Sequence, residues 1–380
     1  MKILLVRDVP GELNAQKMTY NIQEVGLATA LRKKGHSCDI MWCSNDHKYR
    51  EEMIESEGQK IKLYVVRSVD FLKNAWIKDV DRIFLQYDIL QVCEYNQMYT
   101  RHLAKKYPQK FVCYHGPYYS DFNKNYNRMA KLFDKFFVGR YRRLNTPFIT
   151  KSGLAADYLR SKGIRNVTAI GVGLSPTLLE SSAVEVMPEL NAIEDINGLK
   201  LLYIGAIEPR RNALYLLDLL KKLKDEGFAV TLVLIGKYKN VVYQSQFEST
   251  IKEYDLKDSI LYIPRVEQKY LGYVYRHCDI FLLPTIYDIY GMVLLEAMYY
   301  GIPTLTTVNG GSNMMIKDGE NGFVFDNFNL KTWTDQIKKL SEDKKLANKI
   351  GKNAHDTIVN EFTWDALADK FIEEYKKILK

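Results

Sequence analysis

The chain has 380 residues, of which 47% are hydrophobic and 26% are charged, and its formal net charge is +8. This length is about two to three times that of a usual domain, so we expect two domains, and the composition excludes disordered and fibrous proteins. No apolar run approaches the ~20 residues of a membrane span, and the N-terminus lacks the longer apolar stretch of a signal peptide.

The cysteines argue for a reducing compartment. They number five, and no Cys-x-x-Cys pair is present. An odd count without paired spacing favours neither a disulfide framework nor a zinc site. We therefore expect a cytoplasmic protein.

In the first half of the chain, short β-rich runs alternate with helical patterns. Between the first two strands, residues 25–36 have helical spacing, and Gly35 marks the end of that helix. The predicted strands are Lys2–Val6, Cys38–Trp42, Lys62–Val66, Arg82–Tyr87, Phe111–His115, Pro147–Thr150 and Val167–Val172.

The second half shows the same alternation. The predicted strands are Lys200–Gly205, Thr231–Gly236, Ile260–Pro264, Ile280–Pro284, Thr304–Thr307 and Gly322–Phe325. Alternation of strands and helices predicts parallel sheets that are covered on both faces. The fold class is therefore α/β, with two Rossmann-like, doubly wound domains whose ligand-binding edges face a central cleft.

Domain boundaries follow from the periodicity. Residues 181–198 have no clear period and include Pro188, so they are the expected linker between domains 1–180 and 199–361. Residues 362–380 form an amphipathic pattern with one apolar stripe, which predicts a terminal helix.

The run from Pro284 to Pro303 carries the most chemical information. A strand ends at Pro284, a loop follows, and a helix starts near Gly291, with the carboxylates Asp288 and Glu296 eight positions apart. Such a loop is where α/β proteins bind anionic ligands. Carboxylates beside it suit a ligand with both phosphate and hydroxyl groups, such as a nucleotide sugar.

The backbone of that helix start is the expected phosphate contact. The N–H groups of Gly291, Met292 and Val293 would point outward, with the positive end of the helix dipole behind them.

This constellation resembles the carboxylate-x7-carboxylate signature of GT4 retaining glycosyltransferases, which have the GT-B fold. The family usually has Glu at the first position, where this chain has Asp288. The resemblance implies that Glu296 accepts hydrogen bonds from ribose hydroxyls and that Asp288 contacts the transferred sugar. The matching positions are Pro284, Gly291, Leu295, Glu296, Ala297, Met298, Gly301 and Pro303.

A second run, residues 201–220, resembles the strand, loop and helix with which the family holds the donor diphosphate. Arg210 and Arg211 stand just before the helix, and guanidinium groups bind phosphate in a two-pronged manner. They would also stabilise charge on the departing nucleoside diphosphate. The glycines at the ends of the first two strands of this half, Gly205 and Gly236, are further candidates for donor binding.

His115 ends a predicted strand of the first half and is followed by a Gly-Pro turn. It resembles the family's histidine near the donor sugar, where an imidazole bridges sugar hydroxyl and acceptor. A structural histidine at a turn remains the alternative.

Three positions depart from the family pattern. The loop that follows the first strand has Gly11 alone where a glycine pair is common, Ala206 replaces an arginine, and Met314 replaces the acid after Gly310-Gly311. These departures favour a second hypothesis, in which the chain is a degenerate transferase that serves as a partner or scaffold subunit. A third hypothesis is a nucleotide-sugar epimerase of the same architecture.

The excess positive charge lies in the first half. Residues 1–190 hold 29 lysines and arginines against 20 acids, whereas residues 191–380 hold 25 against 26. Basic and aromatic residues interleave in residues 131–143, which fits an anionic membrane surface with Phe136 and Phe137 as anchors. A helix with a core-facing apolar stripe and a solvated basic face fits the pattern slightly better.

Other enzyme classes fit the sequence poorly. A dinucleotide-dependent oxidoreductase needs Gly-x-Gly-x-x-Gly after an early strand, but Pro176 stands at the third glycine position after Gly171. A retaining glycosidase needs carboxyls about 5–5.5 Å apart, whereas eight helical residues span roughly 12 Å. The Asp-x-Asp at 79–81 precedes a predicted strand and does not follow one.

The sequence therefore predicts a retaining glycosyltransferase that acts without a metal or other cofactor. Its expected partners are a nucleoside-diphosphate sugar and a glycan or lipid-linked acceptor, in surface polysaccharide or glycoconjugate synthesis. We expect no nucleic-acid partner, and peripheral contact with the inner face of the plasma membrane stays open. By resemblance, residues 1–180 are the acceptor side, residues 199–361 hold the donor, and the helix at 362–380 returns to the first domain.

Overall fold

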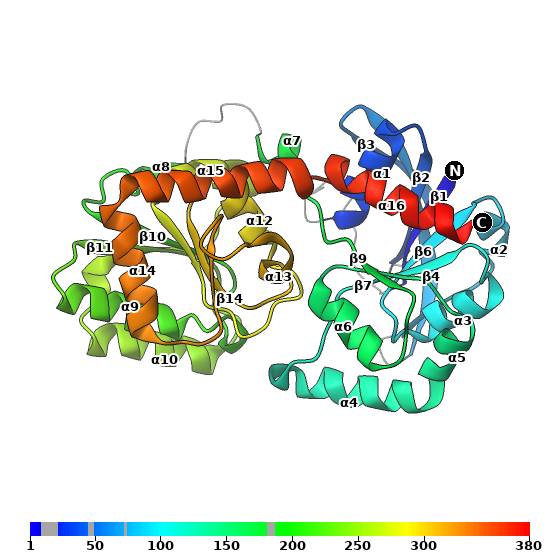
Figure 1. Ribbon diagram of the computed structural model, residues 1–380, viewed down its shortest axis with the longest axis horizontal. Coiled ribbons are helices and arrows are strands. Elements are labelled where there is room, and N and C mark those ends of the chain that lie inside the picture. Colours follow the sequence, from blue (N-terminus) through cyan, green and yellow to red (C-terminus); the bar gives the residue numbers. More distant parts are fainter. Residues whose placement is uncertain (9–21, 45–48, 72–73, 181–186) are drawn as a thin grey trace. The chain divides into compact units, whose positions relative to one another are not determined.

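The structure, a computed structural model, describes residues 1–8, 22–44, 49–71, 74–180 and 187–380. It divides into an N-terminal unit of Met1–Ser175 with Thr363–Lys380, and a C-terminal unit of Pro176–Phe362. Each unit has its own β-sheet with helices packed around it (Figure 1). The predicted fold class, α/β with two Rossmann-like domains, is confirmed.

The N-terminal sheet has the strand order β3-β4-β2-β1-β6-β7-β8-β9 in the described part of the chain, with β5 paired to β4. Its core strands are parallel, while β3 and β5 run antiparallel to β4. The strands are β1 (Lys2–Arg7), β2 (Ser37–Ser44), β3 (Arg50–Ser56), β4 (Gln59–Phe71), β5 (Asn74–Ile77), β6 (Ile89–Cys93), β7 (Phe111–His115), β8 (Phe148–Thr150) and β9 (Val167–Ala169).

Helices cover this sheet because its central strands are apolar on both faces. In β1, for example, the four residues from Ile3 to Val6 are all buried. The helical elements are α1 (Gln23–Lys33), α2 (Asp81–Phe84), α3 (Met98–Lys106), η2 (Asp121–Asn123), α4 (Lys124–Phe133), η3 (Asp134–Val138), α5 (Gly139–Arg143), α6 (Gly153–Ser161) and α16 (Trp364–Ile378).

The C-terminal sheet is parallel throughout, with the order β12-β11-β10-β13-β14-β15. Its strands are β10 (Leu199–Ile204), β11 (Val230–Ile235), β12 (Ile260–Ile263), β13 (Ile280–Leu283), β14 (Thr304–Thr307) and β15 (Phe323–Phe325). Its helical elements are α7 (Pro176–Leu179), α8 (Pro188–Asn191), η4 (Pro209–Arg211), α9 (Leu214–Asp225), α10 (Val241–Glu253), η5 (Lys257–Ser259), α11 (Gln268–Arg276), α12 (Met292–Tyr299), α13 (Ser312–Met315), α14 (Leu330–Glu342) and α15 (Lys344–Glu361).

The terminal helix α16 belongs to the N-terminal unit, where it lies beside α1 (Figure 1). The Tyr375 hydroxyl donates to the side-chain carbonyl of Gln91 on β6 at 2.7 Å. A Cβ atom at Gly26 or Gly173 would lie 2.2 or 2.5 Å from the Trp364 indole, so only glycine permits this close approach.

Some sequence predictions differ from the structure. The predicted strand Arg82–Tyr87 is wrong: this segment starts with the short helix α2, and the strand is β6, seven residues further on. Asp88 fixes β6 in register, because its carboxylate accepts a hydrogen bond from the backbone N–H of Lys2 at 2.7 Å. The edge strands β3 and β5 were not predicted.

The segment expected as a linker is partly folded. Residues 181–186 and the Gly11 loop lie outside the described residues. Residues 187–198 belong to the C-terminal unit and include α8, with Leu190 and Ile193 completely buried. The five cysteines are free thiols in the structure. No helix in the described part of the chain is long and apolar enough to cross a membrane.

Candidate functional site

The C-terminal sheet has a topological switch point between β10 and β13. From β10 the chain adds β11 and β12 on one side, and it then returns to add β13 and β14 on the other. The loops that follow β10 and β13 therefore diverge, which is where α/β proteins bind ligands. These two loops hold the predicted residues Arg210, Arg211 and Asp288.

The two arginines join the two loops. Arg211 forms an ion pair with Asp288. Arg210 donates to the backbone carbonyl of Tyr287 at 2.9 Å and to Glu208 Oε1 at 2.7 Å. Because the Arg211 side chain is only 15% exposed, it is not a solvated cation at a helix start. The arginines are preorganised at the edge of the sheet where a diphosphate is expected.

Helix α12 begins at this edge. Its first flanking residue, Gly291, adopts the left-handed conformation with φ 78°, which glycine enters without strain. No side chain accepts a capping hydrogen bond at this helix start. The N–H groups of Met292 and Val293, in the first turn, therefore have no acceptor within the helix. Their position, with the helix dipole behind them, suits an anion.

Neighbouring loops at this edge approach each other at backbone distance. A Cβ atom at Gly236 would lie 1.8 Å from the carbonyl oxygen of Gly205, and one at Gly310 would lie 1.9 Å from that of Ile289. The buried Asn309 fixes the second contact, because its Oδ1 accepts from the N–H groups of Gly311 at 3.0 Å and Ser312 at 3.1 Å.

Glu296 is completely buried, which excludes a surface acid on an amphipathic helix. Its Oε2 accepts a hydrogen bond from the Tyr275 hydroxyl at 2.8 Å. Its Oε1 is closed to solvent and has no hydrogen-bond partner among the described residues. Burial raises the pKa of Glu296 to about 8. A buried carboxyl oxygen without a partner marks a place where a ligand hydroxyl would be accommodated.

The N-terminal sheet has its own switch point, between β1 and β6. Asp8 follows β1, Glu94 follows β6 and His115 ends β7, so the three side chains come from adjacent strand ends. His115, predicted as catalytic, is fully buried, and its Nδ1 lies 2.7 Å from Glu94 Oε2. Its Nε2 has no partner among the described residues.

The environment of these acids sets their charge. Burial raises the pKa of Asp8 to about 7, opposed by the hydrogen bond that Thr100 donates to it at 2.6 Å. Burial also disfavours the charged form of Glu94, but His115, Lys151 and the backbone N–H of Gly116 together outweigh burial, so the pKa of Glu94 falls below its ordinary value. Glu94 also has a left-handed backbone with φ 53°, a strained conformation typical of functional sites.

Sequence reasoning did not identify Glu94 or Asp8 as site residues. Glu94 was missed because its strand was predicted at residues 82–87, so the acid was not recognised at a strand end. Asp8 directly follows the first predicted strand, and this position was the available signal. Among the described residues, no group of three potential metal ligands comes together.

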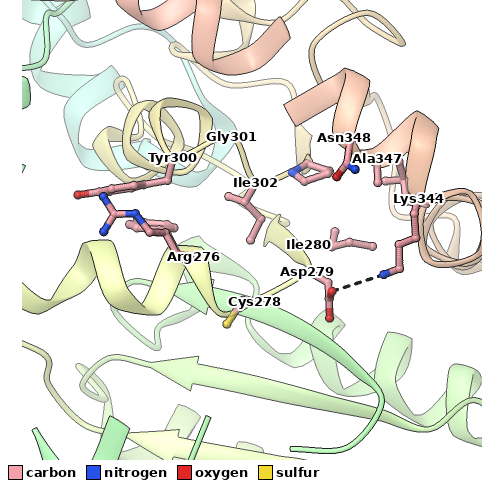
Figure 2. A pocket seen from close by; sticks show the side chains of 13 residues that line it. Arg276, Cys278, Asp279, Ile280, Tyr300, Gly301, Ile302, Lys344, Ala347 and Asn348 are labelled. Atoms are coloured by element: carbon pink, nitrogen blue, oxygen red, sulfur yellow. Dashed lines mark ion pairs between the residues drawn. The ribbon is translucent and has the colours of Figure 1, made fainter. Parts of the chain in front are cut away.

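A cavity of ≈ 300 Å³ lies elsewhere on the C-terminal unit, where β13 and β14 begin (Figure 2). Its lining includes Tyr275, Tyr300 and Arg276, with the Arg276 guanidinium 4.9 Å from the centre of the Tyr300 ring. None of the predicted donor residues lines this cavity.

Two Rossmann-like domains, each built on its own sheet, make this the GT-B fold. Residues 191–357 match the family model described as "Glycosyl transferases group 1". These residues, which lie in the C-terminal unit, belong to this family, GT4.

Individual relatives are similar at low identity. The capsular polysaccharide biosynthesis glycosyltransferase CapM of Staphylococcus aureus is 25% identical over 183 residues, 47% of this chain and 46% of CapM. The D-inositol 3-phosphate glycosyltransferase of Paenarthrobacter aurescens strain TC1 is 28% identical over 127 residues, 33% and 31% of the two chains. These matches span half or less of the relatives' length.

Among solved structures, the Anabaena protein Alr3699/HepE in complex with UDP and glucose has a TM-score of 0.72. The two sequences are 15% identical, and the match covers 99% of this chain and 100% of the Anabaena chain. At this identity the likeness concerns the fold alone.

Proposed function

We propose that this protein is a retaining glycosyltransferase that moves a sugar from a nucleoside-diphosphate donor to a hydroxyl of a glycan or lipid-linked acceptor. The observation that carries the proposal is the switch point of the C-terminal sheet, where Arg210, Arg211 and the start of α12 gather around one edge. In this proposal the positive charge at this edge binds a diphosphate, and the carboxylates bind hydroxyl groups.

In this proposal the C-terminal unit binds the donor. Arg210, Arg211 and the N–H groups of Met292 and Val293 hold the diphosphate, and Glu296 accepts hydrogen bonds from the ribose. Asp288 contacts the transferred sugar once the diphosphate draws Arg211 away from it. The crystal structure of HepE with UDP and glucose supports a donor of this kind, because HepE has the same fold.

The transfer breaks the bond between the anomeric carbon and the diphosphate oxygen through an oxocarbenium-like transition state. The arginines and the dipole of α12 stabilise the negative charge that develops on the diphosphate. The acceptor hydroxyl attacks from the face that the diphosphate leaves, so the anomeric configuration is retained, and its proton passes to the diphosphate. His115, oriented by Glu94, contacts the sugar or acceptor hydroxyl from the N-terminal unit.

The acceptor belongs to cell-surface glycans or glycoconjugates in this proposal. The support comes from relatives such as CapM, a glycosyltransferase of capsular polysaccharide biosynthesis.

The first test is a thermal-shift panel with UDP, GDP, ADP, CMP and their sugar conjugates, with EDTA present. We expect stabilisation by one diphosphate nucleotide, and its loss in Arg211→Ala but not in the matched exposed-cation variant Lys331→Ala. Stabilisation that requires a divalent cation would contradict the metal-independent site. A panel without any shift would reject the donor site and favour the partner or scaffold hypothesis.

Turnover assays distinguish the remaining hypotheses. The donor sugar should appear on an acceptor with its anomeric configuration unchanged. A donor that is converted into a stereoisomer while still attached to its nucleotide would instead indicate an epimerase.

We also propose that the N-terminal unit contacts an anionic membrane surface at the cytoplasmic side. Along α4 and η3, the apolar residues Met129, Leu132 and Phe136 are exposed at i, i+3 and i+7. A parallel row of exposed cations, Arg128, Lys131 and Lys135, stands one position before each of them.

An apolar stripe beside a basic stripe suits the interface of a bilayer with anionic headgroups. Phe136, with 62% of its surface exposed, is the anchor. Phe137, the second predicted anchor, is not available for this role. It packs on Phe133 with ring centres 5.1 Å apart, and the Arg101 guanidinium lies over its ring.

Sedimentation with vesicles tests this contact. We expect binding to phosphatidylglycerol vesicles at low salt, weaker binding at high salt, and none to phosphatidylcholine. The double variant Leu132→Ser/Phe136→Ser should lose binding, whereas Val241→Ser/Val242→Ser, which changes two equally exposed residues of the other unit, should not. Absence of binding at low salt would reject the proposal.

A further inference from the structure

Tyr275 makes a contact with Glu296 that neither the sequence motif nor the family description assigns. Tyr275 lies near the end of α11 and is buried, and its hydroxyl donates to Glu296 Oε2 at 2.8 Å. The same hydroxyl lies 3.4 Å from the backbone carbonyl of Val293 in the first turn of α12. One side chain therefore connects the predicted ribose-binding carboxyl to the predicted phosphate-binding helix start.

The ring of Tyr275 is held from two sides. It stacks on Tyr300 with ring centres 5.3 Å apart and planes at 17°, and it contacts Phe281 on β13 with centres 6.1 Å apart. The Tyr300 ring also contacts the Arg276 guanidinium, 4.9 Å from the ring centre, at the cavity wall (Figure 2). A hydroxyl on a ring packed in this way has little freedom to leave its partner.

The carboxyl of Glu296 has one fixed oxygen and one open hydrogen-bonding position. Helical side chains tilt toward the N-terminus of their helix, so this carboxyl lies toward Val293 and the start of α12. Oε2 is held by Tyr275, while Oε1 has no partner among the described residues. Since Oε1 is closed to solvent, a nucleotide must displace the groups that cover it, and the carboxyl must keep its orientation meanwhile.

We propose that Tyr275 is a positioning residue for donor binding, whose hydroxyl fixes Glu296 Oε2 and presents Oε1 to the ribose hydroxyls. This inference rests on the ribose contact in the proposed function. It predicts that Tyr275 governs how strongly the protein distinguishes ribonucleotides from 2′-deoxyribonucleotides, without touching the nucleotide itself.

The test is titration calorimetry of Tyr275→Phe with the selected nucleoside diphosphate and its 2′-deoxy analogue. Phenylalanine keeps the stack on Tyr300 and removes only the hydroxyl. We expect about tenfold weaker binding of the ribonucleotide and unchanged binding of the deoxynucleotide, the size expected for one hydrogen bond to a carboxyl. The control is Tyr273→Phe, on the same helix as Tyr275. It removes a hydroxyl that donates to Glu194 at 2.6 Å, and it should change the affinity for neither nucleotide.

Other outcomes identify which idea fails. If the wild-type protein prefers the ribonucleotide and Tyr275→Phe keeps that preference, or weakens both ligands equally, the positioning role is rejected and the donor site stands. If the wild-type protein binds no nucleotide, or binds both forms equally, the ribose contact fails and Tyr275 loses its role with it. Glu296→Ala should already abolish the preference for the ribonucleotide, and adding Tyr275→Phe to it should not change nucleotide affinity. A further loss of affinity in the double variant would mean that Tyr275 does not act through Glu296.

Discussion

Arg211 and Asp288, which lie 77 positions apart in the sequence, form an ion pair between the loops that follow β10 and β13. Both side chains are largely buried, with 15% and 11% of their surface exposed. The residue expected to bind phosphate is thus paired with the residue expected to bind sugar before any ligand arrives. In the proposed donor site, a diphosphate would compete with Asp288 for the guanidinium, and its binding would thereby release the carboxylate proposed to contact the sugar.

This pair predicts a stability effect beside the effect on catalysis. Arg211→Ala removes the guanidinium from the buried Asp288 carboxylate and should lower the free energy of unfolding by roughly 2–3 kcal/mol. Asp288→Asn in the same chain should restore most of that stability but not turnover. Denaturant unfolding and an activity assay measure the two effects. Equal stability of Arg211→Ala and wild type would contradict the buried pair.

The buried Glu296 predicts that wild type and Glu296→Gln differ in stability, and that this difference depends on pH. Burial raises the pKa of Glu296 in the native protein to about 8, from its ordinary value of 4.5, so the native protein holds a proton that the unfolded chain releases. The stability that this bound proton gives the native protein is complete below pH 4.5 and declines as pH rises toward 8.

Glutamine does not titrate, so Glu296→Gln should gain stability over wild type between pH 5 and 8, by on the order of 3 kcal/mol at the upper end. Melting temperatures of both proteins at five pH values would show it. Parallel curves would mean that Glu296 is ionised in the native state.

The pair of Glu94 and His115 predicts a separation of turnover from donor binding. Glu94→Gln removes the negative charge beside the imidazole, and His115→Ala removes the ring. Each should lower kcat by about a hundredfold or more, the usual size for a positioned acid–base group.

Nucleotide affinity should stay the same in both variants, because these residues belong to the other unit. Glu51→Gln, which changes an exposed acid of the same sheet, is the control. A parallel loss of nucleotide affinity would place the pair in donor binding.

Trp364 packs directly against Gly173, so we expect alanine substitutions at Gly173 and at Gly139 to affect stability differently. Gly173→Ala would place a Cβ atom 2.5 Å from the indole and should destabilise the protein by about 1–3 kcal/mol through overpacking. Gly139→Ala meets no atom within 4 Å and should be neutral or slightly stabilising. Thermal melts of the two variants test the close packing of α16, and equal melts would contradict it.

The parts of the fold that could be predicted from the sequence are those in which local pattern and tertiary environment agree. Short runs rich in β-branched, aromatic or apolar residues, such as Phe111–His115 and Thr304–Thr307, are strands with the predicted bounds. Arg82–Tyr87 is equally apolar, but its place is taken by β6, whose start is fixed by Asp88 against β1. Such pairings across the sheet leave no local signal.

The site shows the same limit. Motif spacing placed Arg210, Arg211 and Asp288 in loops at one sheet edge, and the switch point brings these loops together. Their roles stay predictions. The partners that complete the arrangement, Tyr275 for Glu296 and Glu94 for His115, come from other elements. Only the folded chain juxtaposes them, so no spacing in the sequence could reveal them.

The return of α16 to the N-terminal unit has a consequence for synthesis on the ribosome. Chains are made from the N-terminus, and domains generally fold as they emerge. Here the first unit lacks the helix that covers α1 and contacts Tyr114 through Phe371 until residue 378 has been made. The unit that begins the chain is therefore completed last, and its uncovered apolar face must be protected from aggregation while the whole C-terminal unit is translated.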